Sequence, residues 1–276
     1  MNITFIGGGN MASAILGGLR SKDFSAQSLR VVEISPEARA RLRQKHGIKC
    51  FEHPHEAWAD RPDDIIVFAV KPQHMHDAAA NCRLATDANL IITIAAGTTL
   101  TTLSRWLGGH TRLIRAMPNT PALIGEGITG LYPMHPARTA QDKQDKECAE
   151  TILGAVSKTV WLQHEGQMDA VTAISGSGPA YVFYFIEALE QAARELGLPA
   201  EVGRQLALRT FTGAARLAAE SHDPVSVLRE RVTSKGGTTE RALASMAAEH
   251  TKEAIVRAIH AANERSREIG KELDKD

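Results

Sequence analysis

The chain has 276 residues with 32 basic and 32 acidic side chains, so its formal net charge is zero. A nucleic-acid-binding protein would show a basic excess or patch, which argues against a nucleic-acid partner. The first apolar run lacks a basic leader and a cleavage site, and no apolar run reaches the ~18 residues of a membrane span. Three scattered cysteines (Cys50, Cys82 and Cys148) indicate reduced thiols in a cytoplasmic protein.

The first twenty residues predict a strand, a glycine-rich turn and a helix start. Asn2–Ile6 is apolar and β-prone, and the residues of the turn are Gly7, Gly8, Gly9, Asn10, Met11 and Ala12. In a G-x-G-x-x-A pattern, Gly7 makes the tight turn, Gly9 lets a pyrophosphate approach the backbone, and Ala12 lets helix and strand pack closely. We therefore predict dinucleotide binding. A purely structural turn is the alternative, because a tight turn needs glycine for steric reasons too.

A second strand at 29–33 ends in Glu33, at the spacing expected of a group near the cofactor ribose. Glu33 would accept a hydrogen bond from a ribose 2′-hydroxyl and repel a 2′-phosphate, which favours NADH. Ser35 and Arg39, at the start of the next helix, could hold a 2′-phosphate instead. The residues by themselves lean towards NADH.

The following segments alternate between strand and helix. A helix is predicted from Pro36 to about His46 with Gly47 as its stop, and then a short strand at 48–51. The apolar runs at 64–70 and 90–96 lack alternation, which is typical of strands buried on both faces of a parallel sheet. A helix at 99–107 and a strand at 113–116 complete this pattern, which predicts βαβ units in a doubly wound sheet.

Strands at 127–132 and 158–162, around a helix at 139–153, should extend the sheet, with either strand direction open. Beyond about residue 165 only helices are predicted. One begins at Asp223–Pro224, with Asp223 as its N-cap, and the last runs from a capping Thr251 to about Gly270. The charged run at 265–276 is predicted to be a solvated helix end. The fold class is therefore α/β, with a Rossmann dinucleotide-binding domain at 1–164 and an all-α substrate and dimerisation domain at 165–276.

The helical part has an unusual apolar segment. Residues 181–186 are apolar on all sides, which predicts a helix buried all round, and the later helices are alanine-rich, which permits close packing. One wholly buried helix in about 110 residues suggests interdigitation with a second subunit, so we predict a homodimer. An ordinary bundle core is the alternative.

Five loops could carry chemistry. Four should lie beyond the carboxyl ends of the strands, where open α/β sheets bind ligands: 7–12, 70–73, 95–97 and 116–121. In the last of these, prolines bracket Asn119, whose amide could serve a nicotinamide carboxamide or the substrate, or could bond to its own backbone. The fifth loop, 232–239, places glycines and hydroxyls before a helix and could bind a carboxylate or a phosphate, although Thr238 could simply cap that helix. The run 175–179 could equally be a packing contact.

Six motifs together resemble those of the Δ1-pyrroline-5-carboxylate reductase family. They are Gly7–Ala12, Ala69–Pro72, Ile94–Gly97, Arg115–Pro121, Ser175–Tyr181 and Val232–Thr239, in the family's order and spacing over nearly the whole chain. The resemblance implies a cytosolic enzyme that makes proline by reducing the C=N bond of 1-pyrroline-5-carboxylate with NADPH or NADH. It implies a Rossmann domain, a helical dimerisation domain and a homodimer or a ring of dimers. It also favours NADPH, which we adopt, with NADH possible.

The resemblance also assigns the site residues. Those implied for the substrate are Ser234, Gly236, Gly237, Thr238 and Thr239, and Thr239 is the candidate for orienting or protonating the ring nitrogen. Lys235 stands where the family usually has proline and should loosen this loop. The residues predicted for the cofactor, from the pattern or the resemblance, are Gly7, Gly8, Gly9, Asn10, Met11, Ala12, Glu33, Ser35, Val70, Lys71, Pro72, Ala95, Ala96, Gly97, Met117, Pro118 and Asn119. The resemblance implies that the residues at 70–72, 95–97 and 117–119 contact the nicotinamide half of the cofactor.

Two other functions are weighed against this one. A β-hydroxyacid dehydrogenase shares the two-domain plan but uses a lysine from the second domain, and residues 165–234 contain no lysine. A non-catalytic dinucleotide sensor would need the glycine turn but not the loop at 234–239. The histidine pairs at 53/55 and 74/76 gain no further ligands, so we predict no metal site.

Overall fold

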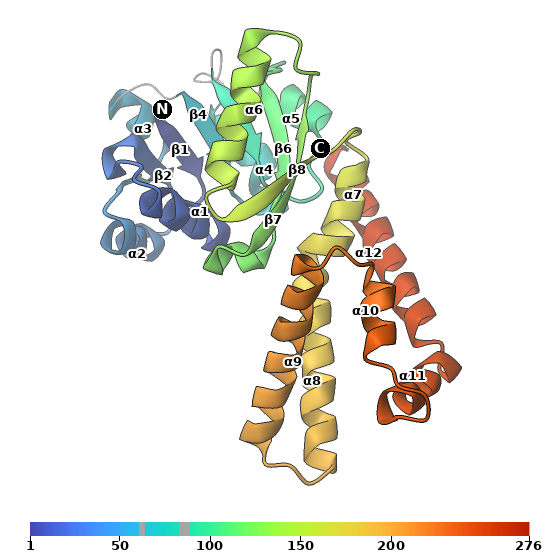
Figure 1. Ribbon diagram of the computed structural model, residues 1–276. Helices are drawn as coiled ribbons and strands as arrows, with labels where there is room; N and C mark the ends of the chain where they lie inside the picture. Colours follow the sequence, from blue (N-terminus) through green and yellow to red (C-terminus); the bar gives the residue numbers. More distant parts are fainter. Residues whose placement is uncertain (61–63, 83–88, 276) are drawn as a thin grey trace. The chain divides into compact units, whose positions relative to one another are not determined.

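The computed structural model describes residues 1–60, 64–82 and 89–275 (Figure 1). The contacts divide the chain into two compact units, Met1–Ser177 with Ala262–Asp276, and Gly178–Ala261. The strands all belong to the first unit: β1 Ile3–Ile6, β2 Leu29–Val32, β3 Lys49–Phe51, β4 Ile65–Phe68, β5 Leu90–Thr93, β6 Leu113–Met117, β7 Gly127–Pro133 and β8 Ser157–Trp161.

The eight strands form one sheet in the order β3-β2-β1-β4-β5-β6-β7-β8. Strands β1 to β6 are parallel, whereas β7 runs antiparallel to β6 and β8 is parallel to β7. The register aligns Ile6 with Phe68, Phe68 with Thr93, and Thr93 with Arg115. The carboxyl ends of β1, β4, β5 and β6 therefore meet along one edge of the sheet. Strand order and direction confirm the predicted doubly wound sheet.

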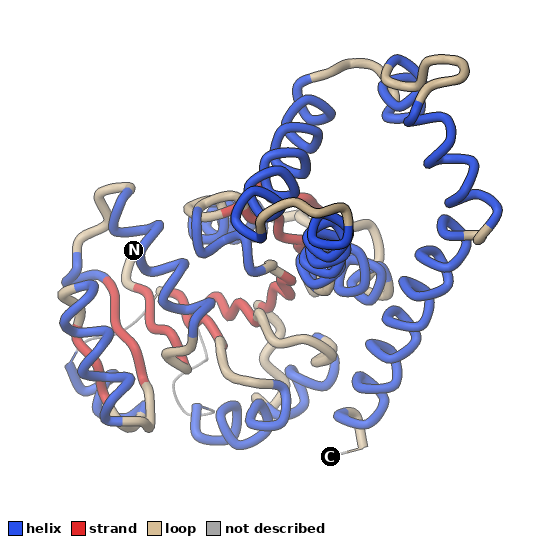
Figure 2. The backbone as a smooth tube through the Cα atoms, turned by 90° about the horizontal axis from the view of Figure 1, so that it is seen from below, coloured by secondary structure: helices blue, strands red, loops and turns tan. Residues whose placement is uncertain are grey.

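Helices cover both faces of this sheet (Figure 2). The helices of the first unit are α1 Asn10–Ser21, α2 Pro36–His46, α3 Pro54–Asp60, α4 Met75–Cys82, α5 Leu100–Trp106, α6 Ala140–Leu153 and α7 Gln167–Val171. Shorter turns are η1 Ala26–Ser28, η2 Pro72–His74, η4 Thr120–Ile124 and the π-helical η5 Thr172–Gly176. Helices α1, α2 and α6 share one apolar core with the sheet, and α3, α4 and α5 share the other. Burial on both faces explains the unbroken apolar runs of β4 and β5.

Local signals in the sequence set several helix ends. The Ser35 hydroxyl accepts from the Ala38 N–H, Pro36 occupies the first turn of α2, and Gly47 ends that helix with φ of +68°. Helix α6 begins with a capping box between Thr139 and Asp142. These ends lie where the sequence predicts them.

The second unit contains α8 Gly178–Glu195, α9 Ala200–Glu220, α10 Val225–Arg231, α11 Thr238–Ala248 and the first part of α12 Thr251–Leu273. Helices α8 and α9 lie side by side (Figure 1), and a Cβ on Gly203 would be 2.7 Å from the Cβ of Ala193. The predicted fold class, a Rossmann sheet followed by helices, is confirmed. No helix in the described part of the chain is long and apolar enough to cross a membrane.

Two expectations about these helices are wrong. Asp223 does not cap α10; its carboxylate accepts from Arg231 at 2.6 Å instead.

Helix α8 is only partly covered within one chain, where Phe183 is 60% and Tyr184 72% exposed, so its burial against a second subunit stays a prediction. Within one chain, α8 packs against α9, and this neighbour covers only part of the apolar surface of α8.

The second error concerns the predicted solvated end of α12, one side of which packs on the sheet unit. Ser266 is buried and donates to Asp169 at 2.7 Å. The Thr102 hydroxyl donates to Asp274 at 2.6 Å, while Ile269 lies against Gly97. Most residues of this segment are charged and exposed, so its composition does not indicate that one side of the helix is buried.

Residues 165–177 pack with the sheet. A Cβ on Gly130 of β7 would be 2.9 Å from Val171, and a Cβ on Gly176 would be 2.7 Å from the Met117 Cε. By contacts, the first unit therefore extends to Ser177, beyond the boundary predicted at residue 164. The last strand ends at Trp161, just before that predicted boundary.

Candidate functional site

The glycine turn after β1 is shaped by close contacts. Gly7 has φ of +100°, and a Cβ there would be 2.8 Å from the Ala69 carbonyl oxygen and 2.9 Å from Val70. Gly9 differs, because it is exposed and a Cβ on it would meet no heavy atom within 4 Å. Gly7 thus serves the fold, and Gly9 leaves open space in front of the backbone.

Helix α1 begins beside this space. Gly9 is its N-cap, and no side chain caps the helix or places an acid in its first turn. The first-turn N–H groups have no partner within the helix, and the helix dipole favours an anion there. Asn10 is exposed, whereas Ala12 is fully buried against the sheet. The start of α1 can therefore accept an anion such as a pyrophosphate.

Glu33 lies between two loops at the carboxyl end of β2. One carboxylate oxygen accepts from the Gly8 N–H at 2.7 Å, and the other accepts from the Ser35 N–H at 2.9 Å. The negative charge is thereby fixed next to the glycine turn. This is the place where an acid accepts from a ribose hydroxyl.

The two groups expected to hold a 2′-phosphate are engaged with this chain's own acceptors. The Ser35 hydroxyl donates to Glu37 at 2.8 Å. The Arg39 guanidinium donates to the Glu33 carbonyl at 2.7 Å and to Glu52 at 2.8 Å. A 2′-phosphate would have to replace some of these bonds.

The loop after β4 borders the glycine turn through the Gly7 contacts with Ala69 and Val70. Val70 is half-buried, Lys71 is exposed, and Pro72 opens η2. The N–H of Ala69 donates to the Ile6 carbonyl at 2.8 Å, which ties this loop to β1. The predicted cofactor residues of the first two loops are therefore neighbours.

The loop after β5 carries the next predicted group. Ala95 is buried and Ala96 half-buried. Gly97 has φ of +78°, and a Cβ on it would be 2.7 Å from Ile269 of α12. This contact with Ile269 explains the glycine by packing, so the cofactor role of Gly97 stays a prediction.

The loop after β6 is held from two sides. Asn119 is 8% exposed, and its amide oxygen accepts from the Ile128 N–H at 2.9 Å, so this oxygen is used within the fold. Met117 is half-buried with Gly176 of η5 against its methyl end. The glycine at position 176 thus has a packing reason, which the sequence leaves as one of two alternatives.

The predicted substrate loop lies in the second unit, before α11. Gly236 has φ of +74°, and a Cβ on Gly237 would be 2.5 Å from the Ser234 hydroxyl. Gly237 is the N-cap of α11, and no side chain caps this helix, so Thr238 is its first residue rather than its cap. Thr239 is half-buried and Lys235 is exposed.

The donors of this loop are partly occupied. The Gly236 N–H donates to the Glu240 carboxylate at 2.6 Å, and the Gly237 N–H donates to the Ser234 carbonyl at 3.0 Å. The N–H groups of Thr238 and Thr239 belong to the first turn, which offers no partner within the helix. A carboxylate can therefore bind at the start of α11.

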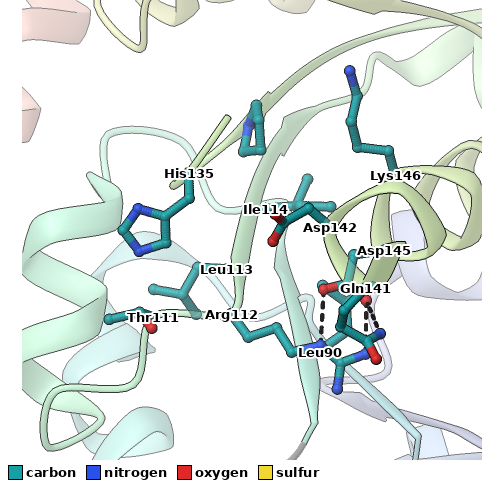
Figure 3. Close-up of a pocket in the computed structure, with 11 residues that line it drawn as sticks. Leu90, Thr111, Arg112, Leu113, Ile114, His135, Gln141, Asp142, Asp145 and Lys146 are labelled. Atoms are coloured by element: carbon teal, nitrogen blue, oxygen red, sulfur yellow. Dashed lines mark hydrogen bonds and ion pairs between the residues drawn. The ribbon is translucent and has the colours of Figure 1, made fainter. Parts of the chain in front are cut away.

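A pocket of about 130 Å³ lies at the amino ends of β5 and β6, opposite the sheet edge that carries the cofactor loops (Figure 3). There Arg112 donates to Asp145 through Nε at 2.8 Å and through Nη2 at 2.6 Å, and Gln141 donates to the same carboxylate. These bonds raise the pKa of Arg112. Because ligands of open α/β sheets bind at the carboxyl ends of strands, we regard this pair as structural.

The sequence reading missed one group at the carboxyl edge. Glu165 accepts from the Leu100 N–H at 2.8 Å and from Arg115 at 3.0 Å. The sequence does show Arg115 as a charged residue inside a buried strand, which indicates that it has a partner. Nothing in the sequence identifies Glu165 as that partner. Among the described residues, no group of three or more His, Cys, Asp or Glu side chains could hold a metal ion.

Two family models match the chain. Residues 2–97 match NADP oxidoreductase coenzyme F420-dependent, and residues 165–269 match Pyrroline-5-carboxylate reductase dimerisation. The Rossmann sheet, the open glycine turn and the first match together define a dinucleotide-dependent oxidoreductase.

Relatives identify the family. The pyrroline-5-carboxylate reductase of Pseudomonas aeruginosa is 41% identical over 98% of this chain and 97% of its own, and that of Haemophilus influenzae is 37% identical over 97% of each. The chain belongs to the pyrroline-5-carboxylate reductase family, as the motifs predict. A Coxiella burnetii reductase structure has a TM-score of 0.87 at 36% identity, covering 97% of this chain and 98% of that one. A Plasmodium falciparum structure with NADP bound has a TM-score of 0.85 at 30% identity, covering 98% of each.

Proposed function

We propose that this chain reduces 1-pyrroline-5-carboxylate to L-proline, the last step of proline biosynthesis. The observation that carries the proposal is that, in a chain of this family, two helices each begin after a glycine N-cap with no side chain capping them. The start of α1 suits a pyrophosphate, and the start of α11 suits a carboxylate. This division of anion sites matches a dinucleotide cofactor and a small carboxylate substrate.

The nicotinamide cofactor, when bound, supplies the hydride. The glycine turn at 7–12 would hold its pyrophosphate, and Glu33 with Ser35 would border its ribose. The remaining predicted contacts come from three loops at the same sheet edge: Val70–Pro72, Ala95–Gly97 and Met117–Asn119. We propose NADPH as the cofactor, with NADH as an alternative that Glu33 favours.

The loop before α11 would bind the substrate. The N–H groups of Thr238 and Thr239, with Gly236, Gly237 and the Ser234 hydroxyl, would hold the carboxylate. The Thr239 hydroxyl would orient the ring nitrogen or give it a proton. A cyclic imine is readily protonated, so the protein mainly has to orient the two reacting carbons, and no His–Asp pair is required.

The assembly would be a homodimer or a ring of dimers in the cytoplasm, with residues 1–164 binding the cofactor and 165–276 forming the substrate and dimerisation domain. Exposed apolar side chains of the helical unit support association. Phe183, Tyr184, Leu196 and Leu217 are each at least 59% exposed in one chain. Exposed apolar side chains that form a contiguous patch mark interaction sites. The molar mass in solution tests this proposal, and a monomer at micromolar concentration would contradict it.

The function is tested by following NADPH absorbance after adding 1-pyrroline-5-carboxylate at neutral pH and identifying proline as the product. Thr239→Ala should lower kcat/KM by roughly 10²-fold if the hydroxyl acts on the nitrogen. Thr239→Ser keeps the hydroxyl and should retain most activity. Gly237→Val should abolish turnover but spare NADPH binding. A folded wild-type chain that binds NADPH and does not turn over would contradict the proposed reaction.

A further inference from the structure

We propose that Glu165 is a positioning residue for hydride transfer, because it bonds residues next to two of the three loops predicted to contact the nicotinamide half of the cofactor, Ala95–Gly97 and Met117–Asn119. The inference rests on the proposed function. A single carboxylate oxygen of Glu165 accepts from the Leu100 N–H at 2.8 Å and from Arg115 at 3.0 Å. The Arg115 side chain is 5% exposed and that of Glu165 is 24% exposed, so the contact is largely shielded from water.

The first bond fixes the loop after β5. Leu100 is the first residue of α5, three positions beyond Gly97, and Thr99 is the N-cap. A carboxylate at a helix start satisfies an N–H that has no partner within the helix and complements the helix dipole. Glu165 therefore anchors the point where the Ala95–Thr99 segment becomes a helix.

The second bond holds β6, the strand that leads into the next loop. Arg115 lies two residues before Met117 and aligns with Thr93 of β5 and Tyr132 of β7. The residues that follow Glu165 reach the same loop, because Gly176 packs against Met117. The segment 165–176 therefore contacts the two neighbouring loops at separate points.

This arrangement makes the spacing of the two loops depend on Glu165. Hydride transfer is sensitive to the separation and angle of the reacting atoms, and a shift of ~1 Å can cost about 10²-fold in rate. Loss of the Glu165 charge should therefore lower kcat more than it weakens NADPH binding. The pyrophosphate site at the start of α1 lies outside this pair of contacts.

The chain offers a matched control at the other ends of the same strands. Arg112 and Asp145 form another partly shielded ion pair beside the amino ends of β5 and β6 (Figure 3), away from the cofactor loops. Asp145→Asn should lower the melting temperature and leave kcat unchanged. Glu165→Gln should lower kcat by about tenfold with the NADPH Kd within about threefold of wild type. A deuterium isotope effect with C4-labelled NADPH should rise only in Glu165→Gln.

A further readout does not need turnover. Fluorescence of bound NADPH reports how tightly the nicotinamide is held, and it should change in Glu165→Gln but not in Asp145→Asn. Equal loss of stability with unchanged kcat, isotope effect and NADPH emission in both variants would show a structural role only and overturn the inference. An inactive wild type would contradict the proposed reaction, and the NADPH emission of the variants would still decide the role of Glu165.

Discussion

The Gly236 N–H donates to the Glu240 carboxylate at 2.6 Å, so an acid of the chain occupies one donor of the predicted substrate loop. Glu240 is the third residue of α11, and its side chain reaches back over the helix start. The contact steadies the loop, but it also places a negative charge where a carboxylate substrate would bind.

Glu240→Gln should lower KM for 1-pyrroline-5-carboxylate by roughly threefold, because glutamine still accepts from Gly236 but no longer repels the substrate. The difference from wild type should shrink at high salt, since this charge is exposed. KM measured at low and high ionic strength checks the prediction. An unchanged or higher KM at low salt would contradict it.

Gly7 and Gly9 should respond differently to alanine. Gly7→Ala forces φ of +100° on an alanine and drives its Cβ against the Ala69 carbonyl, so it should cost about 1–3 kcal/mol in the free energy of unfolding. Gly9→Ala should keep stability within about 1 kcal/mol, since its φ of −70° suits alanine, but weaken NADPH binding at least tenfold by filling the space for the pyrophosphate. Urea unfolding and NADPH titration separate the two effects. Equal effects of the two variants on both measurements would refute the assignment.

Glu33→Gln should raise the ratio of kcat/KM for NADPH to that for NADH by about tenfold, because it removes a charge that repels the 2′-phosphate. A glutamine at this position keeps the side-chain length and can still accept one of the two N–H bonds. The NADH value serves as the internal reference. A wild type that strongly prefers NADH would overturn the choice of NADPH, and an unchanged ratio would show that Glu33 does not discriminate.

His46 should make stability depend on pH. It is buried between α1 and α2, and its ring lies 2.9 Å from the Ser13 hydroxyl. Burial, aided by the charges of Lys45 and Arg20, lowers the pKa of His46. The unfolded chain therefore binds a proton more readily, so stability should fall as pH drops below about 6.5. Thermal unfolding at pH 7.5 and 5.5 checks this. His46→Gln should reduce the difference between the two pH values, and an undiminished difference would exclude His46 as its source.

The sequence alone predicts those parts of the fold that depend on local pattern. The unbroken apolar runs predict β4 and β5, and the glycine turn predicts the βα unit of Gly7 and Gly9. Ser35 and Gly47 mark the ends of α2 because capping and left-handed conformations depend on residues close in sequence.

The features that could not be predicted depend on distant contacts. Gly97 has no room for a side chain because Ile269 packs against it, and the two residues are far apart in the sequence. Asp223 resembles an N-cap in sequence but pairs with Arg231. The exposure of Phe183 in one chain follows from the few neighbours that a single copy provides. Glu165 meets Leu100 and Arg115 only after the sheet has formed.

The return of α12 to the sheet unit has a consequence for synthesis. Ile269 packs against Gly97, and Asp274 accepts from the Thr102 hydroxyl, so both partners come from the carboxyl-terminal end of the chain. Because a ribosome releases the chain from its amino end, the surface at Gly97 and Thr102 stays uncovered while the whole helical unit is made. A chaperone that binds exposed surface would have its longest opportunity in that interval.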